Sequence, residues 1–388
     1  MLLIALMLAG QQAAAQTAPP AQADVVITGN RMREALNKCL ARACPPEEEV
    51  DAAMNAGAES FAAGRYEEAK AILRRAVSRN KRYGARMPGP MSDLYATYAD
   101  VTEHEGDKEV FKHATRESVD VLRRAYGPGH SAVLRASARV GDMWVKLGDL
   151  TSADGEYKDA AGDAQRAGKA DLAAALTFRR AWLALSARDL ARSRRLLEQL
   201  EGSHGQDARF AGLLRVLRAR ISIAKGDAGS TDELVAALRG AGGAEPVLLY
   251  APPYPELGRA GGSGVAVTGG VDVMAARAAT AADHGDLFWA DIGYWIRPDG
   301  KPAEVEILRP AKDAQWAKPL IRNIEARRYA PARQDPGGVG TYRVERFTLR
   351  PSYGLPPGSR IERRTGKLTL HVMDLTRLAQ RDGVAPGP

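Results

Sequence analysis

The sequence of 388 residues predicts a mainly α-helical protein, an α-solenoid of stacked helix pairs, that ends in a small α+β domain. Three observations carry this prediction. A short turn recurs about every 40 residues between helical stretches, Gly and Pro cluster after residue 240, and the apolar period changes to two from Phe288 onward. A long repeat indicates stacked helix pairs, and a period of two indicates β-strands.

Residues 1–15 are predicted to be a signal peptide. The apolar run Met1–Ala9 is too short to span a bilayer, which needs about 20 apolar residues. The small residues Ala13, Ala14 and Ala15 offer a cleavage pattern before Gln16. We therefore expect a periplasmic protein cleaved near Ala15, and no stretch elsewhere that would span a membrane. The alternative is an apolar tail with no targeting role.

Residues 16–46 are predicted to form a linker and one short helix. They contain the only two cysteines, Cys39 and Cys44. Side chains five residues apart point away from each other within one helix, but Pro45 and Pro46 should end the helix just after Cys44. A local disulfide that clamps the helix end is favoured over free thiols. A zinc site is least favoured, because two of its four ligands would be missing.

Residues 47–240 are predicted to form five helix pairs. The turns between paired helices centre on Gly64, Gly106, Gly148, Arg188 and Gly226, which are 42, 42, 40 and 38 residues apart. Gly tolerates the positive φ of a tight link, and an Asp after the turn can accept hydrogen bonds from the next helix. A single pair cannot bury its apolar face, so the pairs should stack into a curved superhelix.

The residues that flank these turns resemble the tetratricopeptide repeat (TPR). The small residues that match the family's pattern in the first and third repeats are Gly57, Ala69, Ala76, Gly141, Ala153 and Ala160. The spacing near 42 resembles the longer kinesin-light-chain type. The resemblance implies a concave surface, lined by the first helix of each pair, that binds partner proteins. Its exposed positions would be Asp100, Arg135, Asp142, Phe178, Trp182 and Arg220.

Two features of the helical region have competing interpretations. Phe178 and Trp182 are four residues apart and share one helix face, either as an anchor for a partner peptide or as core between repeats. The net charge of +8 comes from Arg-rich helices. It indicates either contact with an acidic partner or an anionic surface, or simply solvated Arg side chains that cover apolar surface.

Residues 241–285 are predicted to be a Gly- and Pro-rich linker, and residues 286–352 a β-β-α-β domain. Alternation from Phe288 to Ile296 predicts a first strand, and Asp299-Gly300 predicts a tight turn into a second strand. Apolar residues at helical spacing predict a helix over residues 313–328. Residues 342–349 are predicted to form a third strand.

This order resembles the carboxy-terminal domain of TonB-type proteins. The matching phrases are Pro298-Asp299-Gly300 at the hairpin, Arg328-Tyr329-Ala330-Pro331-Ala332 before the last strand, and Pro253-Tyr254-Pro255 at the opening of the domain. The resemblance implies that the last strand accepts a partner strand at a sheet edge, through Tyr342, Val344 and Arg346. The alternative is an edge protected by the tail, residues 353–388, where Lys367 to Val372 could add a strand.

No catalytic pattern is found. The six histidines form no metal-binding spacing, and there is no nucleophile elbow and no phosphate-binding loop. We expect no catalytic residues, cofactor or metal, and no nucleic-acid partner. The sequence predicts a non-enzymatic cell-envelope scaffold or adaptor that binds proteins through the groove and the sheet edge. The alternatives are a TonB-like accessory of energy transduction, which would need an uncleaved anchor, and an envelope enzyme, which would need a polar cleft.

Overall fold

The computed structural model describes residues 30–226, 235, 238, 245–254, 288–310, 315–330, 338–354, 358 and 363–376. The predicted signal peptide and most of the predicted linker lie outside these residues. The helical part consists of α1 (Arg31–Ala41), α2 (Pro46–Ala62), α3 (Tyr66–Asn80), α4 (Pro88–Glu105), α5 (Lys108–Tyr126), α6 (Ser131–Lys146), α7 (Leu150–Arg166), α8 (Ala170–Ser186), α9 (Leu190–His204) and α10 (Ala208–Lys225).

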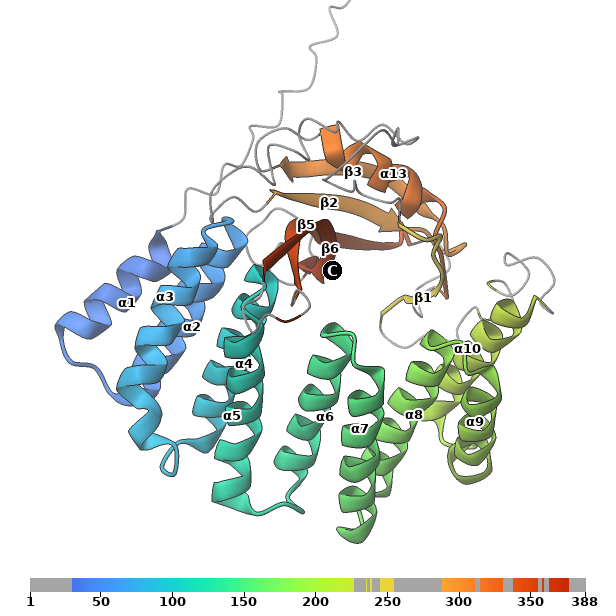
Figure 1. Ribbon diagram of the computed structural model, residues 1–388, viewed down its shortest axis with the longest axis horizontal. Helices are drawn as coiled ribbons and strands as arrows, with labels where there is room; N and C mark the ends of the chain where they lie inside the picture. The colour runs from blue at the N-terminus through green and yellow to red at the C-terminus, as the bar shows by residue number, and fades with distance from the viewer. Residues whose placement is uncertain are drawn as a thin grey trace, which may run out of the picture.

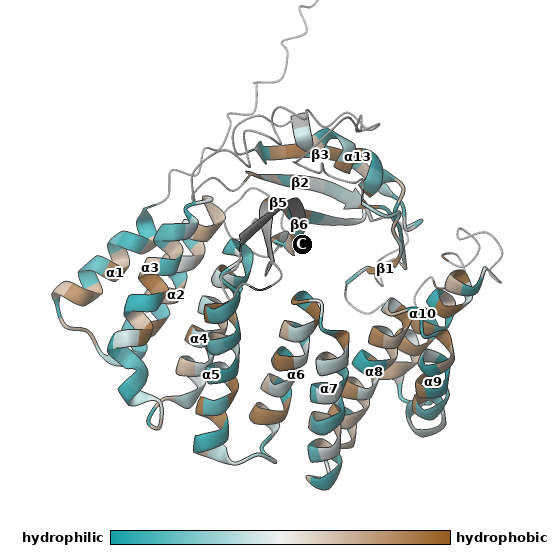
Figure 2. Ribbon diagram, viewed as in Figure 1, coloured by the Kyte–Doolittle hydropathy of each residue, from teal (hydrophilic) through white to brown (hydrophobic). Residues whose placement is uncertain are grey.

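Each helix packs against the next one in the chain, so the helices form a curved array of antiparallel pairs (Figure 1). The pairs are α2/α3, α4/α5, α6/α7 and α8/α9, with α10 opening the next. Figure 2 shows brown apolar turns beside teal polar turns along these helices, as expected for helices that are half-buried between neighbours. The predicted TPR-like helical repeat is therefore present.

The turns of the array lie where the sequence predicts them. Gly64, Gly106, Gly148 and Gly226 all have positive φ. At Gly148 the chain closes with a Schellman motif, in which the Gly148 N–H donates to Val145 and the Asp149 N–H donates to Trp144, both at 3.0 Å.

Arg188 occupies the same position in the fourth pair and also has a left-handed backbone, with φ +63°. The Asp residues after the turns cap the next helix, since Asp149 accepts from the Ser152 N–H and Asp189 from the Arg192 N–H.

The small residues of the TPR-like pattern lie where helices approach closely. A Cβ added to Gly57 would lie 2.9 Å from the Leu73 side chain, and one added to Gly141 would lie 2.2 Å from the Tyr157 ring. Ala69, another small residue of the pattern, is fully buried. Large side chains of one helix thus fill the space that small residues of its neighbour leave open.

Helix α1 precedes the repeats and carries the two cysteines. The structure joins Cys39 and Cys44 by a disulfide, with their Cα atoms 5.1 Å apart. The helix ends at Ala41, earlier than Pro45 and Pro46 would impose, because Ala43 takes a left-handed conformation with φ +49°. The bridge therefore spans the loop after the helix, and Pro46 begins α2 instead of ending α1.

The carboxy-terminal part contains two antiparallel sheets. Its elements are β1 (Val247–Tyr250), β2 (Phe288–Ile296), β3 (Pro302–Pro310), α13 (Lys318–Glu325), β4 (Arg328–Ala330), β5 (Thr341–Gly354) and β6 (Arg363–Asp374). The larger sheet has the order β3-β2-β5-β6, and β1 pairs with β4. The chain order β2-β3-α13-β5 matches the predicted β-β-α-β order, and β1, β4 and β6 are additional.

Both faces of the larger sheet are covered. Ala290, Ile292 and Tyr294 of β2 lie in a core with Leu320 and Ile324 of α13. The opposite face of the sheet packs against the helical repeats. The sheet is therefore the middle layer of the molecule, between α13 and the helix array (Figure 1).

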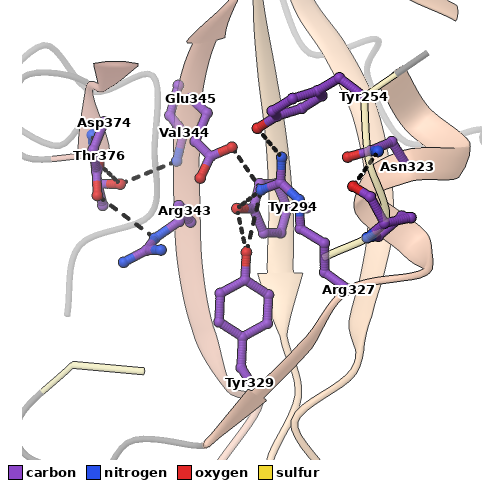
Figure 3. A network of polar contacts seen from close by, with 11 residues as sticks. Tyr254, Tyr294, Asn323, Arg327, Tyr329, Arg343, Val344, Glu345, Asp374 and Thr376 are labelled. Atoms are coloured by element: carbon purple, nitrogen blue, oxygen red, sulfur yellow. Dashed lines mark hydrogen bonds and ion pairs between the residues drawn. The ribbon is translucent and has the colours of Figure 1, made fainter. Parts of the chain in front are cut away.

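A buried polar network lies on the α13 side of the sheet (Figure 3). The Arg327 guanidinium donates to the Glu345 carboxylate at 2.8 Å, to the Tyr294 hydroxyl at 3.2 Å and to the Tyr254 hydroxyl at 3.1 Å. Asn323 donates to the carbonyl oxygens of Pro252 and Pro253, each at 3.1 Å. These bonds hold residues 252–254 on the sheet, where the sequence predicts that this domain opens.

The predicted exposed edge at residues 342–349 is wrong. β5 lies inside the sheet, because β6 pairs along it from Glu345↔Asp374 to Gly354↔Arg363. β6 includes Lys367 to Val372, the segment that the sequence offers as the alternative cover for this edge. Aligned hydrogen bonds with β6 occupy the backbone groups that a partner strand would need.

We predict that Arg188→Gly stabilises the protein by roughly 0.5–1 kcal/mol, because glycine removes the cost of a side chain in the left-handed region. The measurement is urea unfolding. The matched variant is Gly148→Ala, at a turn with φ +82° where an added Cβ meets no atom within 4 Å. Gly148→Ala should lower the free energy of unfolding by about 1 kcal/mol, because alanine is strained in this backbone conformation. Destabilisation by Arg188→Gly would contradict the equivalence of the two turns.

Candidate partner-binding groove and the domain interface

The guanidinium of Arg346, on β5, joins the sheet to the first helix pair. It is fully buried and forms a two-pronged ion pair with Asp291 of β2, at 2.6 and 2.9 Å. On its other side it donates to the carbonyl oxygens of Phe61 and Ala62, at 2.7 and 2.6 Å. These carbonyls belong to the last turn of α2, whose partial negative charge favours a cation.

Aromatic rings enclose this cation. The Trp289 ring lies 4.0 Å from the guanidinium carbon, and the Tyr66 hydroxyl accepts a hydrogen bond from it at 3.2 Å. Burial raises the pKa of Tyr66 to about 12, so its phenol remains neutral. Beside it, Thr348 and His104 share a hydrogen bond of 2.6 Å. At this interface, the polar groups bind one another and aromatic rings pack around them.

A second contact joins the sheet part to the far end of the array. Arg220 of α10 donates to the Leu248 carbonyl of β1 at 2.9 Å and lies over the Trp182 ring at 4.4 Å. Val216 and Ala219 of α10 share an apolar cluster with residues of β1 and β4. The sheet part thus touches both ends of the helix array, and α6 to α9 lie between these two contacts (Figure 1).

A groove of about 800 Å³ lies in the concave side between the two contacts. The first helices of the pairs, α4, α6, α8 and α10, supply most of its lining, with further side chains from α5, α7 and β1. This is the surface that the TPR resemblance implies.

One end of the groove is apolar and aromatic. The Phe178 and Trp182 rings of α8 lie 5.9 Å apart, and both are only partly buried. Phe210 and the exposed Leu213 of α10 complete this end. The core interpretation of the aromatic pair holds in part, because each ring packs on the inter-repeat core, and each ring also lines the groove.

The other end of the groove is charged. Asp142 accepts hydrogen bonds from the Tyr157 hydroxyl and from Arg179, and Lys146 forms an ion pair with Glu103 at 3.6 Å.

Asp100 differs from these groups, because no hydrogen bond or ion pair to it is found within the described part of the chain. Asp100 is exposed in the groove, but the protein atoms around its carboxylate displace part of the water and raise its pKa, although the nearby positive charge of Lys146 opposes this effect.

The structure brings four of the predicted groove residues together: Asp100, Asp142, Phe178 and Trp182. Arg135 is exposed on α6 but lies outside the lining, which Arg139 enters one turn later. Arg220 contacts β1 and Trp182, so the prediction that it faces a partner is wrong.

The three residues predicted for strand pairing lie in the domain interface. Tyr342, Val344 and Arg346 are buried against the helical repeats. They hold the protein together and do not face a partner.

Sequence reasoning missed Trp289, Asp291 and His104. The signal was present in β2, where Trp289 and Trp295 occupy the strand face that alternation would assign to solvent. Aromatic residues on both faces of a strand indicate that both faces are covered. Nothing local in the sequence identifies the covering surface as the α2–α5 region.

Within the described ranges, no helix is both long and apolar enough to cross a membrane. The same residues contain no group of three or more His, Cys, Asp or Glu side chains that could hold a metal ion.

No protein-family model and no curated protein matches the chain. Similar solved structures include a putative kinesin light chain with TPR-like repeats from Podosopora anserina, at 13% identity and a TM-score of 0.41, covering 50% of this chain and 95% of that one. BtubC from P. vanneervenii has 14% identity and a TM-score of 0.42, covering 54% and 86%. The Rap conjugation regulator of plasmid pLS20, in complex with the Phr* peptide, has 12% identity and a TM-score of 0.38, covering 57% and 59%.

At these identities and scores the similarities add nothing on function. The repeat architecture of this chain rests on its own helix packing and turns.

We predict that Arg346→Met lowers the free energy of unfolding by about 3–5 kcal/mol, because it leaves the buried Asp291 and the α2 carbonyls without this partner. Urea unfolding should also change from one transition to two, as the sheet separates from the repeats. The control is Arg309→Met, since Arg309 binds Asp291 at 2.7 Å but is partly exposed. Arg309→Met should lower the free energy of unfolding much less and should still unfold in a single transition. Equal effects of the two variants would contradict the role assigned to Arg346.

We predict that Asp100→Asn raises the melting temperature at pH 7 and has no effect near pH 3. Partial desolvation holds the folded-state pKa of Asp100 above its ordinary value, so its ionised form destabilises the fold. This cost is absent below the unfolded pKa and grows as pH rises through the folded pKa. The gain should stay below about 1 kcal/mol, because solvent still reaches the carboxylate. A loss of stability at pH 7 would contradict the desolvation of Asp100.

Proposed function

We propose that this protein is a non-enzymatic scaffold of the cell envelope that holds a segment of a partner protein in its groove. The observation that carries the proposal is the groove itself, about 800 Å³ in volume, with an aromatic end at Phe178 and Trp182 and a charged end at Asp100. Aromatic side chains held rigidly beside a few polar groups provide binding energy at little cost in conformational entropy.

The volume suits a peptide segment. Pockets of roughly 300–1,000 Å³ bury most of a drug-sized ligand, so a groove of this size can take a few side chains of a bound segment. Exposed apolar side chains at its surface, Leu213 and Val145, would be covered by a bound segment. The contacts of the sheet part at both ends support a groove whose shape exists before the partner binds.

The proposed location in the envelope is supported by two features. The apolar amino-terminal run with its Ala-rich cleavage pattern is typical of exported proteins. The disulfide between Cys39 and Cys44 is typical of oxidising compartments such as the periplasm.

TonB-like strand pairing through β5 is not part of the proposal. The residues that it would use, Tyr342, Val344 and Arg346, are buried against the repeats, and β6 covers the strand. The groove accounts for partner binding without this edge.

The test is site-specific photo-cross-linking in the native cell. A benzophenone amino acid at Ala175, which is exposed inside the groove, should trap a discrete partner protein. The same probe at Lys158, exposed on α7 outside the groove lining, is the control.

Adding Leu213→Ser to the Ala175 probe should weaken the adduct severalfold, because this substitution removes an exposed apolar contact but no core side chain. The proposal fails if Ala175 traps no partner, or if Ala175 and Lys158 trap the same proteins equally.

A further inference from the structure

We propose that the groove selects a peptide segment that carries a basic side chain, Arg or Lys, which binds the carboxylate of Asp100 while an apolar or aromatic side chain of the same segment binds at Phe178 and Trp182. This inference rests on the proposed function and specifies the chemistry of its partner.

The charges of the groove lead to this assignment. Its three cations already have acidic partners in the described part of the chain. Arg179 binds Asp142, Lys146 binds Glu103 at 3.6 Å, and Arg139 lies 3.8 Å from Asp93. An acidic ligand would have to compete with these carboxylates.

Asp100 is the exception among the charged groups that line the groove. It projects from α4, is exposed to solvent in the groove, and makes no hydrogen bond or ion pair with any described residue. Lys146 and Arg139 act on it through their charge, but they form their ion pairs with Glu103 and Asp93. A carboxylate with no partner in the described part of the protein is open to an incoming cation, and a hydrogen bond between two charged groups is stronger than one between neutral groups.

The aromatic end sets the second requirement. Arg220 already covers the Trp182 ring at 4.4 Å, and Phe178 lies 5.9 Å from that ring. Arg220 would repel a second cation at this end. An apolar side chain would instead pack against Phe178, Phe210 and Leu213. The two ends of the groove therefore favour different side chains.

The experiment is selection of a displayed library of random 12-residue peptides against the full chain, followed by affinity measurement with the best peptide. We expect selected peptides to share an Arg or Lys at a fixed spacing from an aromatic or large aliphatic residue. Asp100→Asn should weaken the best peptide about tenfold or more, in line with loss of a hydrogen bond to a charged group.

A double-mutant cycle identifies the pair. Replacing the basic residue of the peptide by Gln should weaken binding to the unmodified protein to the same extent, with little further loss in Asp100→Asn. The control, Asp159→Asn, removes the same charge from α7 outside the groove lining and should leave affinity unchanged.

The outcomes separate the two proposals. Selected peptides that bind in the groove without a preference for Arg or Lys, or that bind Asp100→Asn equally well, overturn this inference and leave the scaffold function standing. If selection against the unmodified protein enriches no peptide beyond those enriched by the Phe178→Ala variant, the result counts against both the scaffold function and this inference.

Discussion

The position of the sheet on the helical repeats depends on one buried cation. Arg346 lies between the carboxylate of Asp291 and the last carbonyl groups of α2, and every side of its guanidinium is occupied. A buried charge costs several kcal/mol unless it is paired and hydrogen-bonded, so only a narrow range of domain positions is acceptable. A slip of β5 by one residue would present Glu345 to α2 carbonyls, and the pairing would become repulsion.

This constraint extends to the groove. In a solenoid each repeat contacts only its neighbours, so small rotations between repeats add up along the array. Here the sheet part contacts α2–α5 at one end and α10 at the other, the latter through Arg220 and the β1 backbone. A connection across the array fixes its curvature, and a groove of fixed shape loses less entropy when it binds a segment.

The sequence predicts what is local and misses what is distant. Gly64, Gly148 and Arg188 are found as turns because their conformations depend on neighbouring residues, and Gly141 as a close approach because the repeat spacing places it there. The β2, β3 and β5 strands follow from their alternation. The docking of the sheet on α2 does not follow, because Arg346 and Phe61 are 285 residues apart in the chain. The TonB-type resemblance places Arg346 at an open edge, and a charged residue in a strand is usually exposed.

Asp100 and Arg346 differ in whether the protein itself supplies a partner for their charge. Arg346 is fully buried, and its ion pair and carbonyl contacts compensate for the lost water, so its role is structural. Asp100 has no such compensation among the described residues, and its raised pKa means that the ionised carboxylate opposes folding. The stability of the fold therefore gives no reason for a carboxylate at position 100. Under the proposed assignment, a basic side chain of the bound segment supplies the positive charge that Asp100 lacks.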